Sequence, residues 1–244
     1  MRARTVGDGQ PVVLIPSLGR GGADFDLLSG ALAARGYRSL VLDPPGVEGV
    51  APVFGSPPTL HDLARLVGDL VSNGPPVHVV GHAFGGRVGR CLAADAPDLV
   101  RSLVILGGGG RVPGDAEARR ALARCFDETL SPAEHLRAVA TAFFAPGNDP
   151  SPWAQGWWPD AARIERQATE ATPLEDWWSA GRTRVLVVVG EQDRIAPVAN
   201  GRAFVAEYPE RSSLVVIEGA GHALLPERPD EVASAVLTHL DASS

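Results

Sequence analysis

Three glycine-bounded segments carry residues that could take part in acyl-transfer chemistry. The first has the spacing that normally brackets an attacking serine, but its central residue, Ala83, offers only a methyl group. The second ends in a carboxylate, Asp193, and the third ends in an imidazole, His222. Their order along the chain is turn, acid, histidine. The segments read GHAFGG (81–86), GEQD (190–193) and GAGH (219–222).

The first segment lies between a strand pattern and a helical pattern. The apolar run 77–80 precedes it, and Phe84, Val88 and Leu92 follow at helical spacing. This is the context of a nucleophile elbow, a strained turn that holds its central side chain above a sheet edge and aims backbone N–H groups at the same point. Residues larger than glycine at positions 81 and 85 would collide where helix and strand pass closely.

Short apolar runs without polar alternation recur along the chain and predict strands buried on both faces, as in a parallel sheet. Helical patterns lie between them, for example at 60–71 after the N-cap candidate Thr59 and at 232–240. Alternating strands and helices indicate an α/β fold with a covered sheet. The six runs are 12–15, 40–42, 77–80, 103–106, 185–189 and 214–217.

Residues 111–180 break this alternation and predict a helical insertion. Ser131 is a candidate helix cap, with Pro132 in the first turn and Glu134 completing a capping box. We therefore predict a core formed by 1–110 and 181–244 and a cap subdomain at 111–180. All five tryptophans fall within the insertion. They either line an apolar ligand pocket or only join the insertion to the core, and both interpretations stay open.

The motifs GHAFGG, GEQDRIAP and GAGHALLPERP resemble those of the α/β-hydrolase superfamily, and within it the small esterases, lactonases and carbon–carbon hydrolases with a helical cap between strands six and seven. The resemblance spans nearly the whole chain. It implies a mostly parallel sheet flanked by helices, with the cap inserted after strand six. It also implies that Asp193 orients His222, and that His222 acts as base toward the nucleophile and as acid toward the leaving group.

The same resemblance implies an oxyanion hole. One donor is the N–H of Phe84, the residue after the elbow position, and the second comes from the loop IPSLGRGG, where Leu18 is the candidate. The aromatic residues of the insertion predict an apolar or aromatic substrate. The residues expected to bind it are Ser17, Phe143, Phe144, Trp153, Trp157, Trp158 and Trp177.

The composition of the chain limits the classes of partner and cofactor that we expect. The net charge of −7 gives no reason to expect nucleic acid, and the two cysteines, Cys91 and Cys125, lack the spacing of a zinc site. No metal or organic cofactor is expected. The N-terminal segment lacks the apolar stretch of a signal peptide, and no run is long enough to span a membrane, so we expect a cytoplasmic protein. The oligomeric state is not predicted.

Ala83 has three interpretations: a serine hydrolase disarmed by substitution, a natural member with lost or changed chemistry, or a coincidental motif. A chance match of the motif at 81–86 is the weakest of these, because it would have to occur together with Asp193 and His222 at the ends of two further strand patterns. We favour a hydrolase of a carboxylic ester, lactone or thioester that forms an acyl-enzyme when residue 83 is serine and is inactive with alanine. The alternatives are a lyase, cyclase or cofactor-free oxygenase that uses the His222/Asp193 dyad for proton transfer, and a non-catalytic small-molecule binding protein.

Overall fold

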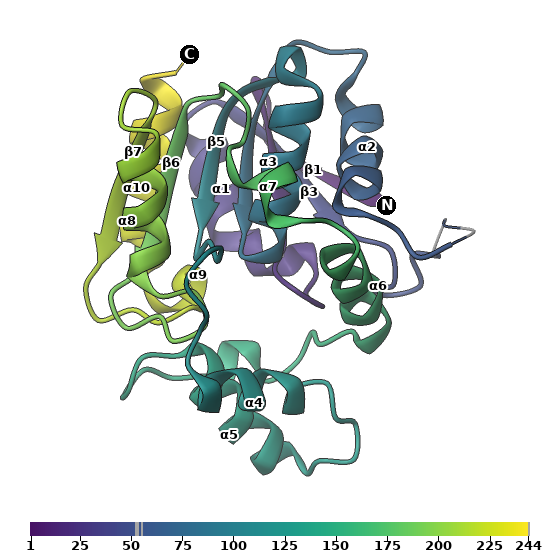
Figure 1. Cartoon of the computed structure of the whole chain (residues 1–244), viewed down its shortest axis with the longest axis vertical. Coiled ribbons are helices and arrows are strands. Elements are labelled where there is room, and N and C mark those ends of the chain that lie inside the picture. The colour runs from purple at the N-terminus through teal and green to yellow at the C-terminus, as the bar shows by residue number, and fades with distance from the viewer. Residues whose placement is uncertain (52–53, 55, 244) are drawn as a thin grey trace.

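The computed structural model describes residues 1–51, 54 and 56–243, and its centre is a twisted sheet (Figure 1). In the described residues seven strands lie in the order β1-β3-β2-β4-β5-β6-β7. Only β1 is antiparallel to its neighbour, so the predicted mostly parallel α/β sheet is confirmed. The strands are β1 (Arg2–Val6), β2 (Gln10–Ile15), β3 (Tyr37–Asp43), β4 (Val77–His82), β5 (Val100–Leu106), β6 (Val185–Gly190) and β7 (Ser212–Ile217).

Strand β1 was not among the six predicted strands. It is an edge strand whose first four residues are exposed, so it lacks the continuous apolar run of the buried strands. Backbone pairing with β3 holds it in place, and Arg2, opposite Asp43, forms an ion pair with that residue. An edge strand can carry polar residues because its side chains face water, and a search for apolar runs therefore does not find it.

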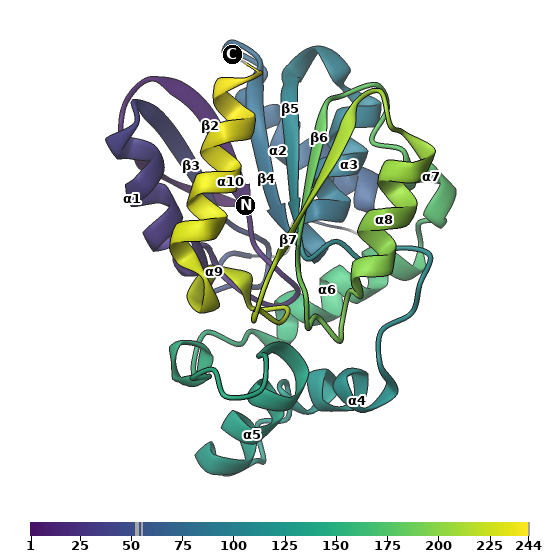
Figure 2. The ribbon, with the colours of Figure 1, turned by 90° about the vertical axis from the view of Figure 1, so that its left-hand side faces the viewer.

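Helices cover both faces of the sheet (Figure 2). Apolar residues of α1 and α10 pack with alternate strand residues such as Val12 and Leu14. Those of α2, α3 and α8 pack with the opposite set, such as Val13 and Ile15. The covering helices are α1 (Asp26–Ala34), α2 (Leu60–Val71), α3 (Phe84–Asp95), α8 (Val198–Glu207), α9 (Leu224–Glu227) and α10 (Pro229–Asp241), with short 3-10 turns η1 (Gly22–Phe25) and η2 (Pro97–Leu99).

The segment 111–180 is helical and follows β5, the fifth strand along this chain, and not the sixth strand that the resemblance implied. Helices α4 and α5 pack on each other beyond the carboxyl edge of the sheet, while α6 packs on α2 and α7 on α3 (Figures 1 and 2). The predicted capping box of Ser131 and Glu134 begins α5. A separate cap subdomain remains a prediction. The elements are α4 (Ala116–Arg124), α5 (Pro132–Phe143), η3 (Ser151–Trp153), α6 (Pro159–Glu170) and α7 (Leu174–Trp178).

Candidate active site

Ala83 lies on a sharp turn between β4 and α3. Its φ of 47° and ψ of −102° are outside the regions that alanine prefers, so the turn is strained. The backbone N–H of Ala83 donates to the carbonyl of Leu106 (2.7 Å) on the neighbouring strand, which fixes the turn. A Cβ on Gly81 would collide with the backbone of Gly85, and a Cβ on Gly85 would collide with the carbonyl of Ile15. The two glycines therefore permit the close approach of strand and helix that the sequence predicts.

Asp193 and His222 follow adjacent parallel strands, β6 and β7, and their side chains meet at the carboxyl edge of the sheet. His222 Nδ1 is 2.8 Å from Asp193 Oδ2. The other carboxylate oxygen accepts the N–H groups of Ile195 (2.8 Å) and Ala196 (2.7 Å). Both side chains are almost fully buried. These bonds fix the carboxylate and favour a proton on Nδ1, which leaves Nε2 as the basic nitrogen.

His82 lies beneath this pair. Its Nε2 is 2.9 Å from the backbone carbonyl of His222, and the two rings are 5.2 Å apart. Burial lowers the pKa of His82 to about 3, so the ring is neutral at pH 7 and donates Nε2–H to that carbonyl. His82 thereby holds the loop of His222 from below.

A cavity of about 300 Å³ opens over the turn and is lined by both Ala83 and His222. Gly107 lies on its wall, where a Cβ would be 3.1 Å from His222 Cε1. The part of the chain that the structure describes offers no hydrogen-bond partner to His222 Nε2. A ligand in this cavity can therefore reach both the methyl group of Ala83 and the basic nitrogen.

Both predicted oxyanion residues, Phe84 and Leu18, line the same cavity. Phe84 is the first residue of α3, so its N–H has no acceptor within the helix. Among the described residues, no hydrogen bond uses the N–H of Leu18. Two backbone donors are thus free beside Ala83, as stabilisation of a developing oxyanion requires.

Glu165 of α6 holds the Leu18 loop and was missed by the sequence analysis. Its Oε2 accepts the N–H of Gly19 at 2.6 Å, and its side chain is buried. Burial raises the pKa of this carboxyl well above its ordinary value. The sequence does carry a signal, because Glu165 lies on the same helical face as the buried Ala161 and Ala168.

Of the residues predicted to bind substrate, Ser17 lines the cavity beside Ala83, and the aromatic residues do not. The Phe143 ring is 5.7 Å from that of His222 but packs into a buried cluster with Phe144 and Trp153. Trp157 lines a separate hollow with Phe126. Trp177 is buried in the main core against α3. In the structure these aromatic side chains mainly join the insertion to the core, and contact with substrate stays a prediction for them.

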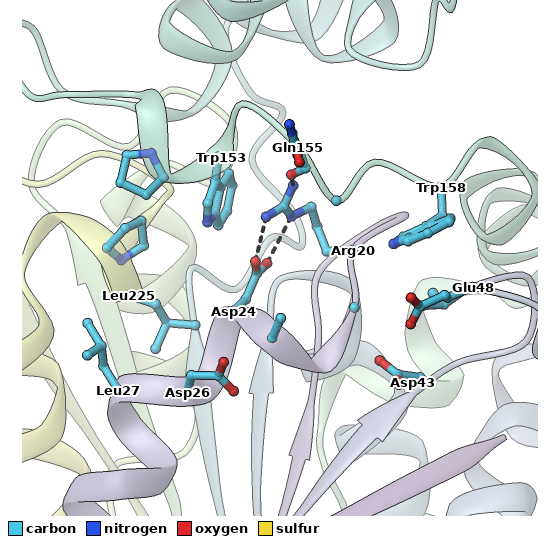
Figure 3. A pocket seen from close by; sticks show the side chains of 16 residues that line it. Arg20, Asp24, Asp26, Leu27, Asp43, Glu48, Trp153, Gln155, Trp158 and Leu225 are labelled. Carbon is cyan, nitrogen blue, oxygen red and sulfur yellow. Dashed lines mark hydrogen bonds and ion pairs between the residues drawn. The ribbon is translucent and has the colours of Figure 1, made fainter.

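Arg20 accounts for the position of Trp153 and Trp157. Its guanidinium lies 4.6 Å from each ring, and Figure 3 shows it between Asp24 and Gln155. Arg20 Nε donates to Asp24 (2.9 Å), and Nη1 donates to the carbonyl of Gln155 (2.7 Å). Trp158 lines the hollow drawn in Figure 3 and is not among the residues that line the cavity of Ala83. The arginine thus joins the loop after β2 to the insertion.

The described residues contain no group of three or more His, Cys, Asp or Glu side chains placed to hold a metal ion. Both cysteines are unpaired and buried, and burial raises the pKa of each thiol to about 12. A membrane-spanning helix is also absent from the part of the chain that the structure describes.

Comparison with known proteins finds a match to the alpha/beta hydrolase family over residues 12–235. A relative from Caulobacter sp. (strain K31), named "Putative carbamate hydrolase RutD", is 26% identical over 97% of this chain and 92% of its own length. A protein of the same name from Variovorax paradoxus (strain S110) is 33% identical over 126 residues; the match covers 51% of this chain and 45% of that protein, less than half its length.

A solved structure has the same overall fold. The crystal structure titled "Putative non-heme bromoperoxidase BpoC", from Mycobacterium tuberculosis H37Rv, superposes with a TM-score of 0.83 at 26% identity. The superposition covers 100% of this chain and 96% of that one. The similarity therefore extends over the sheet, the turn at Ala83 and the helical insertion alike.

Proposed function

Because the chain belongs to the alpha/beta hydrolase family, we propose that its cavity binds a carboxylic ester, lactone or thioester and that a serine at position 83 would let it hydrolyse that bond through an acyl-enzyme. The observation that carries this proposal is the buried His222–Asp193 pair, joined at 2.8 Å, in the same cavity as the strained turn at Ala83. Relatives named as carbamate hydrolases support a carbonyl carbon as the target, because carbamates and esters share that group.

The reaction follows from the positions of these groups. A serine Oγ would replace a hydrogen of the Ala83 methyl group, lose its proton to His222 Nε2 and attack the carbonyl carbon. The N–H groups of Phe84 and Leu18 would stabilise the negative oxygen. His222 would then return the proton to the leaving alkoxide or thiolate. A water molecule, deprotonated by the same nitrogen, would release the acid and restore the serine.

With Ala83 in place, no acyl-enzyme can form. Removal of the nucleophile from such a triad lowers turnover by about a millionfold, while substrate binding is largely retained. We therefore expect the chain with Ala83 to bind a carbonyl compound and scarcely to hydrolyse it.

The test is hydrolysis of p-nitrophenyl acetate and butyrate by Ala83→Ser. This variant should release p-nitrophenolate with saturation kinetics, and the added change His222→Ala should remove at least 99% of that activity. The parent chain and Ala83→Ser/His222→Ala are the matched controls. If Ala83→Ser is folded but no more active than the double variant, the proposal is wrong.

A second candidate is proton transfer by the dyad without any nucleophile. The observation that favours it is that, among the described residues, the His222 ring is oriented by its bond to Asp193 and not by a group at position 83. Such a site would act on a substrate with an acidic C–H or O–H bond, as a lyase or cyclase does. Activity of the parent chain on such a compound, lost in His222→Ala, would favour this candidate over the hydrolase.

A further inference from the structure

The cavity beside Ala83 has an unbalanced positive charge. Arg87 of α3 and Arg119 of α4 both line it. None of the described residues that line it is acidic, and the carboxylate of Asp193 is bonded to His222 and to two backbone N–H groups. The whole chain carries a net charge of −7, so this site differs in sign from the molecule as a whole.

Neither arginine has a carboxylate partner in the part of the chain that the structure describes. Arg87 Nη1 donates to the hydroxyl of Thr169 at 3.2 Å, and its guanidinium faces the ring of Trp177 at 5.4 Å. Burial lowers the pKa of Arg87. A nearby arginine shows the contrast, because Arg194 pairs with both Asp115 (2.6 Å) and Glu117 (2.7 Å). Arg87 is thus partly buried and has no ion pair among the described residues.

A third arginine adds to the charge behind the cavity wall. Arg90 is 1% exposed, and its Nε has no partner among the described residues. Its Nη1 donates to the carbonyl of Gly109 (3.2 Å), a residue of the wall. Burial, together with the charge of Arg87, lowers the pKa of Arg90 to about 9. An anion in the cavity would offset the repulsion between these arginines.

We propose that Arg87 and Arg119 bind a carboxylate of the substrate, so that the cavity selects a small anionic acyl compound. A guanidinium matches a carboxylate with two parallel hydrogen bonds, and a partly buried site strengthens them. The volume of about 300 Å³ is at the lower end for ligand cavities, which favours a short acid with its reactive carbonyl close to the charged end. The reactive carbonyl rests on the proposed function, whereas the anion site does not.

The test compares the binding of monomethyl succinate and dimethyl succinate to the parent chain by isothermal titration calorimetry. These compounds share the ester and differ in one negative charge, and Ala83 prevents their turnover. We expect the anion to bind about tenfold more tightly or better, as for a hydrogen bond to a charged group. Arg87→Gln and Arg119→Gln should each remove most of this preference, and Arg87→Lys should retain part of it. Equal affinity for the two compounds would overturn the proposal.

Arg120→Gln is the matched control, because it makes the same charge change on the same helix at an exposed residue outside the cavity lining. It should leave the preference unchanged; a loss as large as in Arg119→Gln would overturn the proposal. Arg119 is itself exposed, so Arg119→Gln tests the site even if Arg87→Gln fails to fold. Anion binding without hydrolysis by Ala83→Ser would contradict only the proposed function. Hydrolysis by Ala83→Ser without a preference for the anion would contradict only this inference.

Discussion

Replacing Ala83 with glycine should stabilise the protein. With φ of 47° and ψ of −102°, an alanine in this turn costs about 1–3 kcal/mol, which glycine avoids because it has no Cβ. Glycine also gives the unfolded chain more freedom, which offsets about 0.4–1 kcal/mol of that gain. The net increase in the free energy of unfolding is therefore about 0–2.6 kcal/mol. In a chain of this size that raises Tm by a few degrees, at about 2–4 °C per kcal/mol.

Urea unfolding followed by circular dichroism measures this change. The control is Ala94→Gly in the same helix, where alanine is helical and the substitution should cost about 0.5–1 kcal/mol. The two changes delete the same methyl group, so only the backbone conformation gives them opposite signs. If Ala83→Gly lowers the midpoint as much as Ala94→Gly does, the turn is not strained and the elbow interpretation loses its physical basis.

Three other changes test the supports of the site. Gly85→Ala should destabilise the protein by at least about 2 kcal/mol in urea, because its Cβ collides with the Ile15 carbonyl, and a smaller cost would contradict the close approach. Burial raises the pKa of Glu165, so the folded state keeps a proton that the unfolded state loses above about pH 4.5, and stability falls as pH rises. Glu165→Gln should therefore flatten the dependence of Tm on pH between 5 and 8; a curve parallel to the parent's would refute this. His82 changes stability with pH in the opposite direction. Its pKa of about 3 in the folded state lies below the 6.5 of the unfolded chain, so stability falls as pH drops below about 6.5. His82→Asn should make this fall shallower; an unchanged fall would contradict the assignment.

The hydrophobic pattern was sufficient to predict the central sheet. The runs at 103–106 and 185–189 lie in the interior of a parallel sheet, where both faces are buried and every position is apolar; the run at 77–80 is also buried and departs from this pattern only at His78. The motifs at the ends of these strands also predicted which residues would meet, because parallel strands end at the same edge. Strand β1 could not be found in this way, since its side chains are exposed.

The lining of the cavity was harder to predict than its chemical centre. The aromatic residues of the insertion suggested an apolar pocket, but Trp153 and Trp157 stack on Arg20, a partner 133 residues or more away in sequence that no local pattern reveals. Arg87 did leave a local signal. It lies one helical turn after Ala83 and therefore faces the same cavity, so the spacing of α3 alone could have indicated a charged wall.

The most direct test of the account is intact-protein and peptide mass spectrometry of Ala83→Ser after treatment with a fluorophosphonate. The account predicts one covalent adduct, located on residue 83, and its loss when His222→Ala is added. The parent chain should remain unlabelled under the same conditions. A folded Ala83→Ser that takes up no label, or that is labelled equally well without His222, would contradict the claim that His222 and this turn form a nucleophile site.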